Sequence, residues 1–453
     1  MTLTDRWQDA FFLAAAAIAL GNAIHIANGF LDPEAITYLS WAFVLCALAV
    51  LMPRVNWLEQ RRESPTVLLL TAGLIFQFGK LLTDPPGMYL LVEGPQAYVI
   101  YYKGLIAAAV VAGSLVPNGT WFRNSRILAL LAIHFALGLW LIHASPSPVI
   151  DVFLFQRDGI NELFAGGNPY AMTYLDIYGK STVYGDGLSV NGRLTFGFPY
   201  PPLSLFLAIP GHLFGDHRYS QLAAMTASGA LMAYARPGRL GALAGALFLF
   251  TPRGLFVLEQ SWTEPFLVFL LSATVFVACR RETWVPYLFG LFVVVKQYLV
   301  FVVPLAWLIL RRPLPDRNEL GRWALKAVAI GAVVSLPLAL WDIRAFTRDV
   351  VTLQFYQPFR IDALTYSANA VRGGGSPWPT SLAFIAAVLA VGLSLLRAPR
   401  TPAGFAGAVA LTYFGFFSLS KQAFCNYYYF VLGALCCAVA AFYSHENTRA
   451  DQR

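Results

Sequence analysis

Long apolar runs, joined by short polar connections, set the pattern of this 453-residue chain. Most of the runs approach the length of about 20 residues that a helix needs to cross the hydrocarbon core of a bilayer. A backbone inside lipid has to satisfy its hydrogen bonds internally, so each run predicts a helix. The predicted spans are 10–30, 38–52, 67–82, 98–116, 127–144, 323–340, 382–396, 404–419 and 424–443.

The middle of the chain is ambiguous because it holds three shorter apolar runs, 203–214, 219–235 and 240–250. They cannot all cross the bilayer while Arg236 and the segment 151–202 keep their preferred sides. Either one of the runs is re-entrant, or 284–310 is a single tilted span instead of a hairpin. Together the runs predict an all-α fold, a polytopic membrane helical bundle of about 11–14 transmembrane or re-entrant helices.

Between Asp151 and Pro202 the apolar pattern gives way to a long polar and aromatic connection. A turn between two spans needs only a few residues, so a connection of about fifty predicts a function at the membrane surface. Its first part, 149–165, predicts an amphipathic helix lying in the membrane interface, ended by Gly166 and Gly167. The apolar stripe of this helix is Phe153, Ile160 and Phe164, and its polar side is Arg157, Asp158 and Glu162.

Composition excludes a water-soluble globular class and several kinds of site. Hydrophobic residues make up 58% of the chain and charged residues 12%, an excess that one soluble core cannot bury. The net charge of +8 comes mainly from arginines in short connections, so we expect no nucleic-acid partner. The five cysteines lie in or beside apolar segments and predict neither a disulfide framework nor a zinc site.

The arginines predict the topology, because cytoplasmic loops carry an excess of Lys and Arg. The clusters are Arg54 with Arg61 and Arg62, Arg123 with Arg126, Arg236 with Arg239, Arg280 with Arg281, Arg311 with Arg312, Arg317 and Arg322, and Arg397 with Arg400. With these clusters inside, the connections 151–202 and 341–378 and the turn at Lys421 lie on the outer face of the membrane.

Three regions follow from this pattern. Residues 1–126 predict N-terminal transmembrane hairpins with short loops, and 444–453 is a polar C-terminal tail. Residues 127–443 hold nearly all distinctive motifs, including the outer loop 146–200, so this is the predicted catalytic region.

Asp151 is the candidate catalytic residue, because it stands where a span ends and the interfacial helix begins. A carboxylate there can take the proton of a hydroxyl group held at the membrane surface. The alternative is an acid that stabilises the positive end of the helix dipole. Asp158 lies about 10 Å further along such a helix, too far to share a metal with Asp151. Asp158 therefore pairs with Arg157 or stays solvated, no cofactor is predicted, and a divalent metal, though compatible, has no supporting ligand cluster.

Two blocks carry a resemblance to a known family: Gly166–Tyr170, which reads Gly-Gly-Asn-Pro-Tyr, and the Tyr-Pro-Pro of 200–202. Together with Asp151 they resemble family 87 glycosyltransferases of the GT-C superfamily, over roughly 127–443. The resemblance implies a GT-C-type fold and transfer of a sugar, mannose favoured, from a polyprenyl-phosphate carrier. The acceptor would be a glycan or glycolipid hydroxyl at the outer face of the cell membrane. Transfer would invert the anomeric centre, with Asp151 as general base.

The chain departs from the family pattern at its start. Several apolar segments precede the span before Asp151, where the family begins directly with that span. The rival acids are Asp32 and Glu34, after the first span, but their loop is short and lacks both motif blocks.

Lys296 and Gln297 interrupt the apolar stretch 284–310, and a charge in such a place is costly and usually functional. The resemblance implies that Lys296 binds the lipid phosphate; the alternative is a lysine snorkelling to the interface. Gln297 is a further candidate for donor binding. So are Lys421 and Asn426, which form a second polar opening on the same face.

The remaining candidates would line an acceptor or sugar cleft. They are Arg157, Asp158, Tyr170, Tyr200, Gln260 and Glu264. Arg360, Asp362 and Arg372 are weaker candidates, for which a solvated loop is the favoured interpretation.

A different class, a transporter or flippase for a lipid-linked precursor, is the alternative function. Such a protein should carry acids at the membrane midplane and discontinuous helices in symmetric positions. Here most acids lie near the interfaces and the long loop is on one side, which favours the enzyme.

Overall fold

The structure is a computed structural model that describes residues 7–53, 63–92, 94–117, 122–179, 183–310 and 316–442. These residues are mostly helical with almost no strand, as predicted, and six helices are long and apolar enough to cross a membrane. Those six are α1 (Trp7–Ile26), α2 (Pro33–Leu51), α4 (Ser64–Thr83), α5 (Val99–Gly113) with the turn Pro95–Tyr98 before it, α6 (Arg123–Ala144) and α15 (Arg317–Trp341). The chain is therefore a helical membrane protein.

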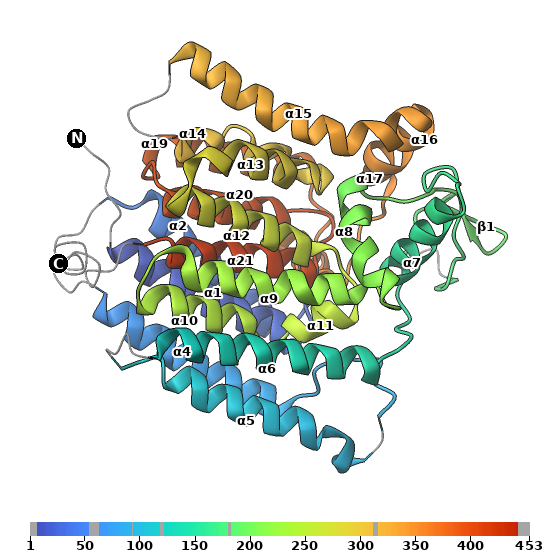
Figure 1. Cartoon of the computed structure of the whole chain (residues 1–453). Coiled ribbons are helices and arrows are strands. Elements are labelled where there is room, and N and C mark those ends of the chain that lie inside the picture. Colours follow the sequence, from blue (N-terminus) through green and yellow to red (C-terminus); the bar gives the residue numbers. More distant parts are fainter. Residues whose placement is uncertain are drawn as a thin grey trace.

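Shorter helices complete the bundle around one central helix, α21 (Cys425–Ala440), which is buried along nearly its whole length. The others are α9 (Arg218–Ala235), α10 (Arg239–Leu249), α11 (Gly254–Glu259), α12 (Glu264–Arg280), α13 (Val285–Val294), α19 (Ser381–Arg397) and α20 (Pro402–Ser418). Helices α1, α10, α12 and α20 pack against α21 (Figure 1). The N-terminal helices thus belong to the same bundle as the C-terminal ones, with α2 on α20 and α4 on α10.

The ambiguous middle resolves because α8 (Pro202–Leu213) lies across one end of the bundle instead of crossing it (Figure 1). Its 12 residues rise only about 18 Å, far short of the bilayer core. Arg218, at the start of α9, donates to the carbonyl of Ser145 at the end of α6, 2.8 Å away, so α9 begins at that same end.

The stretch 284–310 is a hairpin. Helix α13 ends at Val294, Lys296 follows in an extended conformation, and the chain returns through the 3-10 helix Gln297–Val302 and the short α14 (Ala306–Ile309). Arg400, in the connection between α19 and α20, donates to the carbonyl of Trp307 at 3.3 Å, which fixes the returning limb. The sequence left open either one short run that does not cross or a single tilted span over 284–310. The structure shows the first, and the run is α8.

Arginine-bearing turns and long loops gather at opposite ends of the bundle. At one end Arg239 pairs with Glu63 at 2.8 Å, and Arg280 donates to the carbonyl of Ala235 at 3.1 Å. At the other end, called the loop end from here on, the Leu31 amide donates to the Asp362 carbonyl at 2.8 Å. This separation is what the predicted topology requires. The predicted cluster members Arg54, Arg61, Arg62, Arg311 and Arg312 and the tail 444–453 lie outside the described residues.

The predicted interfacial helix is α7 (Asp151–Phe164), which packs on α8 at the loop end. Phe153 and Ile160 are buried as expected, but Phe164 is 53% exposed because it lies in the last turn, beyond the covered part of the helix. Gly166 adopts a left-handed φ of 83° and ends the helix, a conformation that favours glycine. Further along the loop, a small hairpin pairs β1 (Ser189–Val190) with β2 (Arg193–Leu194).

Three short helices, α16 (Ile343–Thr347), α17 (Leu353–Tyr356) and α18 (Tyr366–Arg372), follow α15 at this end. Between α16 and α17, the fully buried carboxylate of Asp349 accepts the Gly197 amide at 2.9 Å and pairs with Arg348 at 2.5 Å. Arg348 also donates to the carbonyl of Tyr170 at 3.2 Å. This ion pair holds the two limbs of the long loop against the bundle.

Candidate active site

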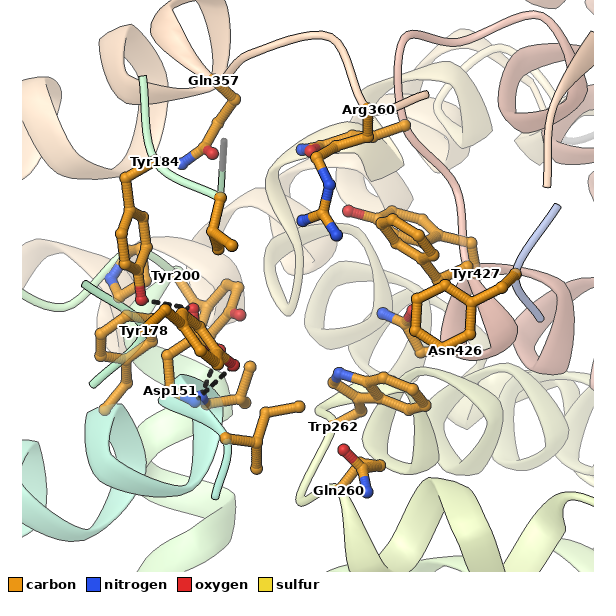
Figure 2. A pocket seen from close by; sticks show the side chains of 18 of the residues that line it. Asp151, Tyr178, Tyr184, Tyr200, Gln260, Trp262, Gln357, Arg360, Asn426 and Tyr427 are labelled. Carbon is orange, nitrogen blue, oxygen red and sulfur yellow. Dashed lines mark hydrogen bonds between the residues drawn. The ribbon is translucent and has the colours of Figure 1, made fainter. Parts of the chain in front are cut away.

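A cavity of about 330 Å³ opens at the loop end, where segments from distant parts of the sequence converge (Figure 2). Its aromatic lining is Phe30, Tyr89, Phe155, Tyr178, Tyr184, Phe196, Tyr200, Phe256, Trp262, Phe424 and Tyr427. Its amide side chains are Asn28, Gln260, Gln354, Gln357, Gln422 and Asn426. The charged residues in the lining are Asp151, Lys296 and Arg360. Concave, aromatic walls with a few polar groups are typical of sites for small ligands.

Asp151 lies at the first turn of α7 with its carboxylate in the cavity wall. Oδ2 accepts a hydrogen bond from the Tyr184 hydroxyl at 2.9 Å, and Oδ1 accepts the Val152 amide at 2.8 Å. The Tyr178 hydroxyl lies 3.5 Å from Oδ1 and accepts the Asp151 amide at 3.2 Å. The carboxylate therefore satisfies an orphan amide of the helix start, as the alternative interpretation of Asp151 expected, and also faces the cavity.

Burial raises the pKa of Asp151 above its ordinary value. The hydrogen bonds from Tyr184, Val152 and Tyr178 and the positive charge of Arg360 oppose this shift, because they stabilise the ionised form. Burial and the nearby carboxylate raise the pKa of Tyr184, so its hydroxyl stays protonated and remains a donor. The result is a carboxylate that is held in place and more basic than an exposed one.

Lys296 reaches the cavity from between α13 and its return turn, and it is 5% exposed. Its ammonium group pairs with Glu264 at 3.2 Å, contacts the Thr263 hydroxyl at 2.5 Å, and lies 4.0 Å from the centre of the Tyr200 ring. Glu264 is fully buried behind it, so the pair carries no net charge. Removing one partner of such a buried pair costs about 3–5 kcal/mol, so Lys296 also has a structural role.

Arg360 stands across the cavity from Asp151, and its guanidinium group points into the space between them (Figure 2). Nε and Nη2 form a bidentate pair with Asp362, at 2.8 and 2.7 Å. Nη1 donates no hydrogen bond within the described part of the chain, so one edge of the guanidinium is left for a ligand. The Phe424 ring supports the group at 4.9 Å.

A buried polar network positions α7 relative to the opposite wall. Ser261, in a left-handed conformation with φ 55°, accepts through its carbonyl from Gln156 at 2.6 Å and from Gln221 at 2.9 Å. Its hydroxyl contacts His217 Nε2 at 2.6 Å. Because Gln156 belongs to α7 and Ser261 follows Gln260, this network fixes the distance between the Asp151 wall and the Trp262 wall.

The structure brings five of the predicted site residues into one cavity and places the others outside it. Those in the lining are Asp151, Lys296, Asn426, Tyr200 and Gln260, and those outside it are Gln297, Lys421, Arg157, Asp158, Tyr170 and Glu264.

Several of the residues outside the lining have evident structural contacts instead. Arg157 and Asp158 form a surface ion pair with each other at 2.7 Å. Lys421 donates to the carbonyls of Gln357 and Phe355, at 2.5 and 3.2 Å, and so holds the end of α17. Tyr170 is fully buried, and its hydroxyl donates to the Tyr200 carbonyl at 2.8 Å. Gln297 lies 3.5 Å from the Pro199 carbonyl, and Glu264 is the counter-ion of Lys296.

The sequence did not single out Tyr178, Tyr184, Asn28 and Tyr89, and it favoured a solvated loop for Arg360, but all five line the cavity. The two tyrosines lie in an irregular part of the loop, and the other residues come from connections that carry no periodic pattern. Contacts between segments that are far apart in the sequence bring these residues together, and the pattern of apolar and polar positions does not reveal such contacts.

No protein-family model, curated protein or solved structure shows a significant match to the chain. Within the described ranges, no group of three or more His, Cys, Asp or Glu side chains is arranged to hold a metal ion.

Proposed function

We propose that the protein is a membrane glycosyltransferase of the GT-C type that uses a polyprenyl-phosphate-linked sugar. The observation that carries the proposal is the placement, on facing walls of one aromatic cavity, of the part-buried carboxylate of Asp151 and the open guanidinium edge of Arg360 (Figure 2). A base and a cation on facing walls suit a reaction in which a hydroxyl loses a proton while a phosphate leaves.

In the proposed reaction the acceptor hydroxyl donates a hydrogen bond to Asp151. Its oxygen attacks the anomeric carbon of the donor sugar while the bond from that carbon to the phosphate oxygen breaks. The electron pair of this bond stays with the polyprenyl phosphate, and the proton passes to Asp151. Attack opposite to the leaving phosphate inverts the anomeric centre. Oδ2 keeps a free lone pair for this proton, because only Tyr184 donates to it, whereas Val152 and Tyr178 both donate to Oδ1.

Arg360 is the proposed phosphate ligand, because a guanidinium matches a phosphate in both charge and geometry. Both cations have a carboxylate partner, but Lys296 is buried and its ammonium group is held by Glu264 and Thr263, whereas Arg360 keeps one guanidinium edge open beside Asp362. Lys296 therefore supports the phosphate less directly. Lys421 is left out of this role because its ammonium group is bound to main-chain carbonyls.

The cavity walls suit a carbohydrate. Aromatic faces such as Trp262 and Tyr427 pack against the apolar faces of sugar rings, and amides such as Gln260 and Asn426 exchange hydrogen bonds with hydroxyl groups. Mannose as the sugar, a glycan or glycolipid as the acceptor, and the outer face of the cell membrane as the location rest on the sequence resemblance and the arginine topology.

The test is sugar transfer by the purified protein in lipid nanodiscs, from radiolabelled polyprenyl-phosphate mannose to membrane acceptors. Asp151→Asn should reduce transfer by about 100- to 10,000-fold, the contribution of a positioned general base, and keep the binding of polyprenyl phosphate. Asp158→Asn is the matched control, because it removes an acid of the same helix outside the cavity. Transfer at the wild-type rate by Asp151→Asn would exclude Asp151 as the base.

A further inference from the structure

The N-terminal helices contribute part of the cavity wall. Asn28 and Phe30 come from the connection between α1 and α2, and Met88 and Tyr89 come from the connection after α4. These residues precede the region that the family resemblance covers, so the resemblance gives them no role.

The connection after α1 is seated firmly beside the cationic wall. Gly29 has a φ of 77°, and a Cβ there would lie 2.3 Å from the backbone nitrogen of Cys425. The Phe30 ring meets the Phe424 ring edge-on at 5.5 Å. The Leu31 amide donates to the carbonyl of Asp362. These contacts place Asn28 next to the segments that carry Asn426 and Arg360.

Asn28 is unusual in its backbone and in its unused amide. Its φ of 55° is left-handed, a conformation that asparagine tolerates better than most residues. Its Oδ1 is shielded from solvent and has no hydrogen-bond partner, and its amide nitrogen donates to no group in the described part of the chain. The amide of Asn426, on the same wall, is likewise unpartnered there. A shielded polar atom is normally hydrogen-bonded, so the unpartnered Oδ1 of Asn28 points to a polar ligand, and the amide of Asn426 in the same lining can bind that ligand too.

We propose that Asn28 and Asn426 form a subsite for the ring hydroxyls of the donor sugar, and that the N-terminal helices thereby set which sugar the protein accepts. This inference rests on the proposed function. The donor's phosphate lies at Arg360, so the sugar ring attached to it extends along the neighbouring wall, where both amides stand. A side-chain amide has donor and acceptor atoms and can therefore bind two adjacent hydroxyls of one ring.

The experiment compares mannosyl polyprenyl phosphate with its 2-, 3-, 4- and 6-deoxymannosyl analogues, in both transfer and equilibrium binding. Asn28→Gly removes the amide and keeps the left-handed backbone. Asn191→Gly is the matched control, because Asn191 has a φ of 51° in the exposed turn of the β hairpin. Binding of sugar-free polyprenyl phosphate reports whether the cavity itself is intact.

Wild-type protein should prefer the full donor over at least one deoxy analogue by about tenfold, the loss expected for one hydrogen bond. The Asn28→Gly variant should bind the full donor more weakly than wild type, by a similar factor, and should bind that analogue and the full donor with equal affinity. Its affinity for sugar-free polyprenyl phosphate should equal that of wild type. Asn191→Gly should match wild type.

The inference is overturned if Asn28→Gly keeps the wild-type discrimination against every analogue. It is also overturned if the substitution lowers the affinity for sugar-free polyprenyl phosphate by the same factor as the affinity for the full donor, since the effect would then be structural. A wild-type protein that transfers none of these donors and does not bind sugar-free polyprenyl phosphate would instead exclude the proposed function, and the two failures are thus distinguishable.

Discussion

At the scale of single residues, the chemistry of the site depends on how Asp151 is held. A part-buried carboxylate that accepts a tyrosine hydroxyl at 2.9 Å has a fixed orientation, whereas an exposed one samples several. The opposing effects of burial and hydrogen bonding then set the pH at which it can accept a proton.

This balance predicts the acid limb of the pH profile. Since burial raises the pKa of Asp151, transfer should fall, as the pH is lowered, at a higher pH than an ordinary carboxylate would give. Tyr184→Phe removes a hydrogen bond that lowers this pKa, so it should move the acid limb further up. The measurement is kcat/KM against pH for wild type and Tyr184→Phe. An unchanged limb in the variant would show that Tyr184 does not act on the Asp151 carboxylate.

Two cations of the loop end should behave differently when neutralised. Arg360→Gln should weaken the binding of polyprenyl phosphate at least about tenfold, because a charge-assisted hydrogen bond is lost. Lys421→Gln should leave that affinity close to wild type and lower the thermal stability, because its ammonium group holds the carbonyls at the end of α17. Binding isotherms and melting curves of the two variants check this, and the reverse pattern would contradict the assignment.

At the residue scale, the sequence could single out residues of the cavity lining where a residue interrupts a strong pattern. Lys296 stands out inside an apolar stretch, and Tyr200 precedes a Pro-Pro pair. The sequence pattern gave no comparable signal for Tyr184 or Asn28, because each gains its place only from contacts with segments far along the chain.

At the scale of elements, the connection after α4 is shaped by one buried carboxylate. Glu259 is fully buried and accepts the amides of Met88 and Tyr89, at 2.6 and 2.8 Å. A Cβ on Gly87 would lie 2.3 Å from Glu259 Oε1, so only glycine fits there without a shift. This contact holds Met88 and Tyr89 in the cavity wall.

The close approach predicts a sharp effect of Gly87→Ala. The added methyl group should displace the connection, reduce transfer and destabilise the protein by about 1–3 kcal/mol, as overpacking does. Gly79→Ala is the matched control: no atom lies within 4 Å of a Cβ there, and alanine favours the helix α4. Thermal unfolding and transfer rates of both variants test this, and equal behaviour would show that the connection tolerates movement.

Helix patterns predicted most elements well and failed at short ones. The apolar windows coincide with the long helices, and the stop at Gly166 is confirmed. The orientation of α8 relative to the bundle could not be predicted from the sequence. Periodicity and length do not distinguish a helix that lies across the end of the bundle from a short helix that crosses the membrane. Tertiary contacts, such as that from Arg218 to Ser145, determine its placement.

At the scale of the whole molecule, the arginine distribution predicts on which side the cavity opens. A cysteine at exposed Asp186 should react with a membrane-impermeant maleimide on intact cells, and one at exposed Glu282, at the opposite end, should react only after permeabilisation. The native cysteines are buried except Cys279, which is half-buried. The two new cysteines are therefore introduced into the Cys279→Ser variant, which also serves as the unlabelled control. The opposite labelling pattern would invert the proposed topology.

The most direct test of the central claim follows the donor itself. Wild-type protein in proteoliposomes is given radiolabelled polyprenyl-phosphate mannose and a lipid-extract acceptor, and the fate of the carrier is measured by chromatography. A glycosyltransferase should release polyprenyl phosphate in equal amount to the glycosylated acceptor. A carrier that crosses the membrane, or merely binds, with its sugar–phosphate bond intact would contradict the account and favour a transporter.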